Sequence, residues 1–172
     1  TRYFYDDPHS ELPSAIEDIT GSRKQMTWSR YGQLLTLTDC SGYQTRYEYN
    51  RFGQVTAIHR EEGLSQYRAY DKRGRLVSQQ NTQGHETRYE YNIAGDLTTV
   101  LHPDGSKQTI SYDAAGHPVS TTEGGLTRQM EYDPAGRVTR LINENGAGAT
   151  FTYDLPGRLA QETGFDGRTQ RY

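Results

Sequence analysis

Hydrophobic and polar residues alternate in several short segments of this chain. In residues 45–49, two tyrosines fall on one face of an extended segment, while Arg46 and Glu48 fall on the other. The same alternation recurs in residues 87–91 and 150–153. A period of two residues is typical of strands with one buried face, and helical periodicity is absent. The pattern therefore predicts short β-strands.

The alternating segments are copies of one repeating unit. Each copy contains an aromatic residue followed by a small polar residue, and positions are counted below from this aromatic anchor. The anchors are Tyr5, Trp28, Tyr49, Tyr70, Tyr91, Tyr112, Tyr132 and Tyr153. Most anchors are 21 residues apart, which indicates about eight copies of a 21-residue repeat and a single repeat domain over residues 1–172.

Each copy contains two turn signals. The first turn starts with a small polar residue, most often Asp or Asn, directly after the anchor, and in every copy except the first it has Gly at position +4, an arrangement that suits a type I turn followed by a left-handed residue. Its aspartates include Asp71, Asp113, Asp133 and Asp154, and its glycines are Gly32, Gly53, Gly74, Gly95, Gly116, Gly136 and Gly157. A second Gly at position +14, as in Gly105, reverses the chain into the next copy. Each copy therefore predicts an antiparallel hairpin.

Apolar residues follow the first turn at position +6 and often at position +9, as in Val55 and Ile58. These two positions cannot share one face of a regular strand, so we expect a bulge or a strong twist in each return strand.

The anchors themselves predict a second feature. Since Tyr49, Tyr70, Tyr91, Tyr112, Tyr132 and Tyr153 occupy one repeat position, we expect them to stack across strands in a mostly buried ladder on one sheet face. The alternative for a tyrosine is sugar binding, and the candidates outside the pattern are Tyr31, Tyr43 and Tyr67.

Composition makes the tyrosines important for folding. Leu, Ile, Val and Phe make up only 27 of 172 residues, whereas 14 tyrosines supply further apolar area. With 22 acidic and 19 basic residues, the chain shows no overall charge that would attract nucleic acid or an anionic membrane. It also has no apolar run long enough to span a membrane, and the single Cys40 cannot form an internal disulfide.

Residues typical of catalysis or metal binding are scattered. The histidines His9, His59, His85, His102 and His117 stand singly, without a second ligand at metal-site spacing. No serine lies in a nucleophile motif, and the glycine pairs lack the helix and lysine of a phosphate loop. We therefore expect no enzyme activity, no metal and no cofactor.

The repeat resembles the YD repeats of RHS proteins, which also occur in the B and C components of insecticidal toxin complexes and in teneurins. Residues 91–97 and 164–172 are similar to the core of enterobacterial RHS proteins in particular. The resemblance implies a long antiparallel sheet that curves and spirals into a hollow shell around a C-terminal toxin domain. It also implies an autoproteolytic DPxG-type motif, and residues Asp133–Gly136 are similar to this motif. The place of these residues in the repeat nevertheless favours a turn.

These implications define the expected function. The chain would be a structural encapsulation module of a bacterial polymorphic toxin. The protein would be cytoplasmic before export and would then be secreted or displayed at the cell surface. Type VI secretion is an example of the export route. As a fragment of a longer chain, it would have flanking repeats and the toxin domain as partners, with self-association through edge strands. The alternative function is an extracellular carbohydrate- or protein-binding repeat domain.

Overall fold

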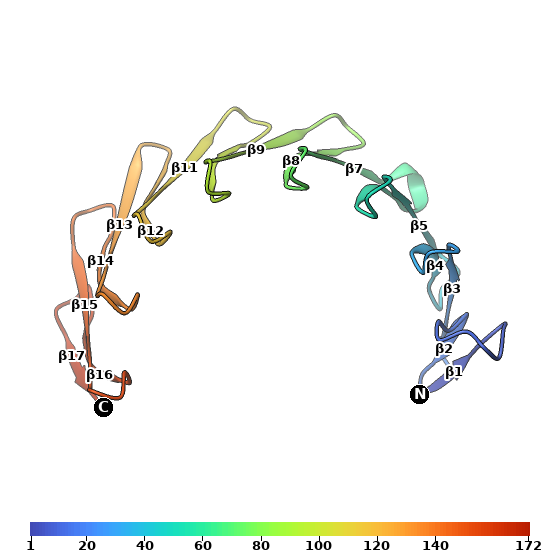
Figure 1. Ribbon diagram of the computed structural model, residues 1–172, viewed down its shortest axis with the longest axis horizontal. Helices are drawn as coiled ribbons and strands as arrows, with labels where there is room; N and C mark the ends of the chain where they lie inside the picture. The colour runs from blue at the N-terminus through green and yellow to red at the C-terminus, as the bar shows by residue number, and fades with distance from the viewer. The chain divides into compact units, whose positions relative to one another are not determined.

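The computed structural model describes residues Thr1–Tyr172, and its regular structure is β apart from one 3₁₀ turn, η1 at Glu61–Gly63 (Figure 1). The strands in the first half are β1 Arg2–Phe4, β2 Ala15–Glu17, β3 Arg23–Trp28, β4 Leu34–Thr38, β5 Gln44–Tyr49, β6 Val55–His59, β7 Ser65–Tyr70 and β8 Leu76–Asn81. Those that follow are β9 Glu86–Tyr91, β10 Leu97–Leu101, β11 Lys107–Tyr112, β12 Pro118–Glu123, β13 Leu126–Tyr132, β14 Val138–Ile142, β15 Gly148–Tyr153, β16 Leu159–Thr163 and β17 Thr169–Arg171. The predicted all-β class is confirmed.

Two compact units make up the chain, Thr1–Thr87 and Arg88–Tyr172, and they contain copies one to four and five to eight. In the first unit each strand from β1 to β7 pairs antiparallel with the next strand. In the second unit the same holds from β9 to β16. Figure 1 shows that successive turns within a unit lie at alternate edges of its sheet. The predicted tandem antiparallel hairpins are therefore confirmed.

The first turn has the predicted geometry. In copy four the backbone N–H of Asp71 donates to the carbonyl of Arg75 at 2.9 Å, and the N–H of Gly74 donates to the carbonyl of Asp71 at 3.0 Å. Gly74 has φ of 81°, a left-handed conformation that glycine adopts without steric cost. This is a type I turn closed by a left-handed residue, and it joins the two strands of one hairpin.

Most second turns repeat this geometry, as at Asn81 and Gly84. Copy six differs, because Gly124 and Gly125 both have positive φ and form a two-residue turn between the paired residues Glu123 and Leu126. Two positive φ values are typical of the tightest hairpin turns, which explains why this copy is one residue shorter.

Each return strand contains the expected bulge. In copy three, Tyr49 lies opposite Val55 and Glu48 lies opposite Ala57, so that Thr56 is an extra residue on the return strand. The same shift of register recurs in the other copies from two to eight. Because one extra residue reverses the side-chain alternation, position +9 returns to the face that carries the anchor.

We call this surface the tyrosine face, and it carries the anchors together with positions −2, +6 and +9. In copy three, Tyr47 and Ile58 lie opposite each other on it, and in copy five Tyr89 and Val100 do so. The buried residues of the whole chain are Ala15, Ala57, Ile58, Thr99, Val100 and Ala149. No helical layer covers either face of the sheet, so most other side chains remain partly exposed.

We predict that replacing Ile58 with Ala lowers the free energy of unfolding by about 2 kcal/mol, because Ile58 is only 8% exposed and loses its contacts on the tyrosine face. The matched control is Ile93→Ala, since Ile93 is 91% exposed at a turn. Its effect should stay within about 0.5 kcal/mol. Urea unfolding followed by circular dichroism measures both values, and equal effects would contradict the proposed packing.

Candidate functional site

Anchor tyrosines join successive copies within each unit. The side-chain hydroxyl of Tyr49 donates a hydrogen bond to the backbone carbonyl of Leu34, at position +6 of the preceding copy, over 2.7 Å. The same bond joins Tyr70 to Val55 (2.8 Å), Tyr112 to Leu97 (2.7 Å), Tyr132 to Pro118 (2.8 Å) and Tyr153 to Val138 (2.7 Å). We call this bond the tyrosine clasp.

The bulge explains why this carbonyl needs a side-chain donor. In copy three, the pairing of the return strand with the next copy ends at Ala57 and Tyr67, so the carbonyl of Val55 lies beyond the last ladder pair. A partly buried carbonyl without a partner costs free energy, and the hydroxyl of Tyr70 satisfies it.

Trp28 takes the same place in copy two, where its indole N–H donates to the carbonyl of Pro13 at 2.9 Å. An anchor residue therefore needs a ring with a hydrogen-bond donor at its far end, and this donor can be an indole N–H as well as a hydroxyl. Burial raises the pKa of Tyr49, with a further contribution from Tyr47, and burial likewise raises the pKa of Tyr112, with a further contribution from Asp96. These hydroxyls therefore stay protonated as donors at neutral pH.

A second recurrent contact links positions +1 and +5 of the first turn. The carboxylate of Asp133 accepts hydrogen bonds from Nε and Nη2 of Arg137, both at 2.7 Å. The other pairs are Ser29 with Gln33, Asn50 with Gln54, Asp71 with Arg75, Asn92 with Asp96, Asp113 with His117, and Asp154 with Arg158. Aspartates pair with arginine or histidine, asparagines pair with an amide or carboxylate oxygen, and the hydroxyl of Ser29 donates to the amide oxygen of Gln33, so the two positions are chemically matched within each copy.

The side chain at position +5 also reaches the next copy. His117 stacks on the ring of Tyr132 at 4.8 Å between centroids, and the guanidinium of Arg137 lies 4.6 Å from the ring centroid of Tyr153. The expectation that anchors stack on one another is corrected for these two rings, because the return strand separates successive anchors and brings position +5 against the ring. The six anchors from Tyr49 to Tyr153 are mostly buried, as expected, although none is completely buried because no second layer covers them.

Two features of the structure favour glycine at position +4 of copy seven. Gly136 has φ of 79°, and a Cβ added there would lie 2.9 Å from Nε2 of His117 in the preceding copy. The left-handed backbone disfavours a side chain, and the neighbouring imidazole leaves no space for one. This glycine therefore allows successive first turns to pack against each other.

The structure places the DPxG-like segment in an ordinary first turn. Oδ1 of Asp133 accepts the backbone N–H groups of Ala135 and Arg137 at 2.9 and 3.0 Å. Asp71 makes the equivalent bonds in copy four, where no proline is present. The hydrogen bond from the backbone N–H of Arg137, followed by that from its side chain, lowers the pKa of Asp133. The carboxylate therefore acts as a charged turn residue.

The three tyrosines outside the repeat pattern lie exposed. Tyr31 is 73% exposed, with the guanidinium of Arg30 lying over its ring at 4.6 Å. Tyr67 makes an edge contact with His59 at 6.0 Å between ring centroids, and Tyr43 is 56% exposed. Two of the three rings thus already have a neighbour within this chain.

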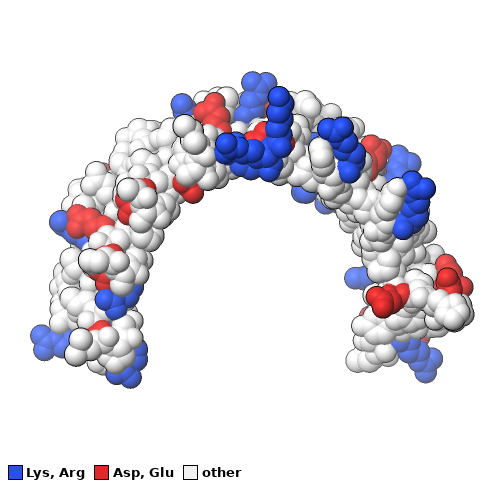
Figure 2. Space-filling model, viewed as in Figure 1, with Lys and Arg blue, Asp and Glu red and all other residues white.

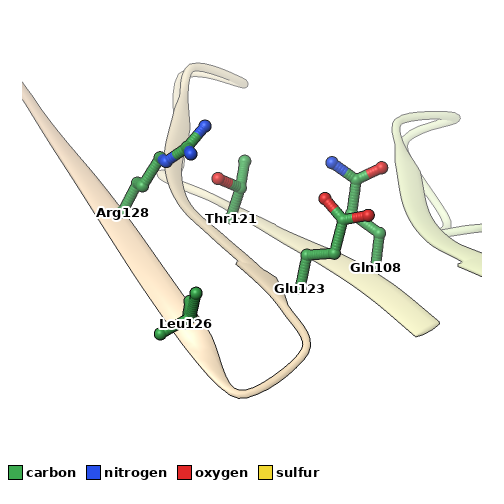
Figure 3. Close-up of a pocket in the computed structure, with 5 residues that line it drawn as sticks. All are labelled: Gln108, Thr121, Glu123, Leu126 and Arg128. Carbon is green, nitrogen blue, oxygen red and sulfur yellow. The ribbon is translucent and has the colours of Figure 1, made fainter. Parts of the chain in front are cut away.

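A shallow hollow lies on the tyrosine face beside the second turn of copy six (Figure 3), and its lining residues are Gln108, Thr121, Glu123, Leu126 and Arg128. Strand pairing sets Gln108 opposite Glu123 and Thr121 opposite Arg128. Arg128 donates from Nε to Glu144 at 3.0 Å, so its charge is already paired. The hollow offers no histidine or cysteine to act as a base or a thiol nucleophile.

Other sites are limited in the same way. No group of three or more His, Cys, Asp or Glu side chains is placed to hold a metal ion. No helix has the length and apolar character needed to cross a membrane.

These observations define a structural repeat protein, in which hairpin copies are joined by antiparallel strand pairing and by one recurrent side-chain hydrogen bond. Residues 7–123, more than half of the chain, match the Teneurin YD-shell family model, and the chain belongs to this family. Residues 112–148 and 132–169 also match the RHS Repeat model. The predicted relationship to RHS and YD-repeat proteins is therefore confirmed.

Two curated relatives are toxins. The chain is 41% identical over 69 residues to double-stranded DNA deaminase toxin A of Burkholderia cenocepacia, which covers 40% of this chain and 5% of that protein. It is 46% identical over 43 residues to toxin protein Tse5 of Pseudomonas aeruginosa, which covers 24% of this chain and 3% of that protein. The chain thus spans only a small part of each relative's length.

Solved structures share the fold. The crystal structure of TcdB2-TccC3-Cdc42 superposes with a TM-score of 0.71 at 17% identity, covering 83% of this chain and 9% of that one. The Tc holotoxin pore of Photorhabdus luminescens gives a TM-score of 0.69 at 18% identity, with the same coverage. The family match and the two toxin relatives, together with this shared fold, identify the chain as a shell-type repeat module related to toxins.

We predict that Tyr153→Phe lowers the free energy of unfolding by about 1 kcal/mol, because it keeps the ring on Arg137 but leaves the carbonyl of Val138 without its donor. Tyr153→Ala, which also removes the ring, should cost about 3 kcal/mol. Urea unfolding gives both values, and Tyr3→Phe, at an exposed tyrosine outside the clasp, serves as the control. A Phe variant as stable as the parent would show that the clasp contributes nothing.

We also predict that stability falls on acidification. The pKa values of Asp71 and Asp133 are lowered in the fold, first by the backbone N–H groups of Arg75 and Arg137. A lowered folded pKa stabilises the chain above the unfolded value of about 3.9, and this contribution is lost as pH falls through the folded pKa. Urea unfolding between about pH 6 and 3 should therefore show a decline that the double variant Asp71→Asn, Asp133→Asn reduces. If stability depends on pH in the double variant as it does in the parent, these aspartates are not the source of the decline.

Proposed function

We propose that this chain forms part of the wall of a hollow shell that encloses a C-terminal toxin domain of the same longer protein. In this proposal the protein is a bacterial polymorphic toxin, and it leaves the producing cell through a secretion system such as type VI. The chain itself carries out no catalysis. Its immediate partners are flanking repeats and the enclosed toxin domain.

The observation that supports this function best is the continuity of the joints between copies. Within each unit every strand pairs with the next, and the tyrosine clasp closes the position that the bulge leaves open. A wall needs this uniform connection more than it needs any single site. Since two relatives are named as toxins, a toxin is the cargo that fits this family context best.

The contacts of Asp133 support the proposal that the chain carries out no catalysis. Its carboxylate is engaged by two backbone N–H groups and the side chain of Arg137, as in turns that lack the DPxG-like segment. A catalytic carboxylate would instead need to reach a reacting bond.

We predict that, in the full-length protein containing this chain, the C-terminal domain resists added protease while the shell is intact. The double variant Tyr132→Ala, Tyr153→Ala removes two successive clasps and should expose that domain to digestion, which mass spectrometry of the fragments can follow. The control is Ile93→Ala, an exposed turn residue. Digestion of the C-terminal domain in the parent protein, as fast as in the isolated domain, would rule out enclosure.

A further inference from the structure

The tips of the first turns differ in charge along the chain. The tips are positions +2 and +3, between the Asp, Asn or Ser at position +1 and the Gly at position +4. In copies two to four they are Arg30 and Tyr31, Arg51 and Phe52, and Lys72 and Arg73. In copies five to eight they are Ile93 and Ala94, Ala114 and Ala115, Pro134 and Ala135, and Leu155 and Pro156, none of which is charged. The first unit therefore carries a basic and aromatic edge that the second unit lacks.

These tip side chains are exposed, and Figure 2 shows Lys and Arg atoms at the surface over the region of β3 to β8. Tyr31 is 73% exposed and Phe52 is 71% exposed. The guanidinium of Arg51 lies 4.7 Å from the ring centroid of Phe52, and Arg30 packs on Tyr31 in the same way. Each of these two tips thus presents a cation and an aromatic ring side by side.

Arg30, Arg51 and Lys72 are not neutralised by the residue at position +1 of their own turns. Copies two and three have the uncharged Ser29 and Asn50 at position +1. In copy four Asp71 is already paired with Arg75 at 2.7 Å. The edge therefore keeps a net positive charge, although the whole chain has a net charge of −3.

The tips are also held in place before any partner binds. Oδ1 of Asn50 accepts the backbone N–H groups of Phe52 and Gln54 at 3.0 and 3.1 Å. Nε2 of Gln54 then donates to the carbonyl of Gly74 in the next copy at 2.7 Å, which connects the turns of copies three and four. A surface ordered in advance loses little conformational entropy on binding.

The spacing of the tips selects the conformation of a partner. Successive tips are two strands apart, which corresponds to about 9.6 Å in a β-sheet. A polyproline II helix advances about 3.1 Å per residue with three residues per turn, so every third side chain returns to the same side after about 9.3 Å. In an extended β-strand, side chains on one side recur every 6.6 Å or so, which does not match.

We propose that the basic and aromatic edge of copies two to four binds an acidic peptide in the polyproline II conformation, with Asp or Glu at every third position. The carboxylates pair with Arg30, Arg51 and Lys72, and the proline rings between them pack on Tyr31 and Phe52, since aromatic surfaces are suited to polyproline II segments. Asp6 and Asp7 occupy the equivalent turn of copy one, and their charge confines the peptide to the three basic tips. This inference does not depend on the enclosure of a toxin.

A single-stranded nucleic acid is the other polyanion to consider. It binds through stacking of its bases on open aromatic faces. Here Arg30 and Arg51 already cover one face of the rings of Tyr31 and Phe52. Because the other face of each ring is equally open to a base or to a proline ring, it is the match between the tip spacing and the three-residue repeat of polyproline II that favours the acidic peptide.

Fluorescence anisotropy with the 172-residue chain tests the proposal, using a labelled 15-residue peptide that repeats Glu-Pro-Pro. We expect saturable binding that weakens on the order of tenfold in the triple variant Arg30→Gln, Arg51→Gln, Lys72→Gln, because three exposed ion pairs are lost. The control variant Lys24→Gln, Arg46→Gln, Arg60→Gln removes the same charge from exposed positions elsewhere in the first unit and should bind like the parent.

A second peptide with the same composition, but with its five Glu residues adjacent, tests the spacing and should bind several-fold more weakly. Equal binding of the two peptides, or equal losses in the two triple variants, would reduce the edge to a general charge effect and overturn the proposal. Tighter binding of a 15-nucleotide oligothymidine than of the spaced peptide would overturn it in favour of nucleic acid. Circular dichroism of each variant verifies that the fold is retained.

Discussion

The way in which the copies of this protein are joined depends on one backbone carbonyl that must receive a hydrogen bond. The bulge in each return strand brings position +9 onto the tyrosine face, but it leaves the carbonyl at position +6 beyond the end of the next ladder. A ring with a polar donor at its tip, placed 14 or 15 residues further along the chain, reaches that carbonyl. The bulge, the anchor and the repeat length are therefore parts of one geometric solution.

The turn edge adds a second set of contacts between copies. A side chain at position +5 binds position +1 of its own turn, and in copies six and seven it also covers the anchor of the next copy. His117 and Arg137 both do this, although one is an imidazole and the other a guanidinium. What matters at this position is a flat, polar group of sufficient length, which explains how different residue types share one role.

Much of the fold could be predicted from single copies, because turns and strands are local. The glycine at position +4 indicated a left-handed turn residue, and the apolar positions +6 and +9 indicated a bulge; both are present at Gly74 and Thr56. Position +5 was missed because Gln54, Arg75 and His117 have no residue type in common. Only a comparison of this position with position +1 reveals their chemical match. The basic edge was missed because the net charge averages over both units.

The recurrence of the same joint has a consequence for how such a gene can change. Since the donor of one copy and the acceptor of the copy before it are alike at each joint where the clasp is observed, duplication or loss of a whole 21-residue segment would recreate a complete joint at the new boundary. A deletion within a strand would instead separate the bulge from the ring that serves it, whereas the shorter second turn of copy six leaves the clasp between Tyr132 and Pro118 intact. Evolution of these arrays should therefore favour changes of length in whole copies, with variation inside a copy concentrated at the turn tips.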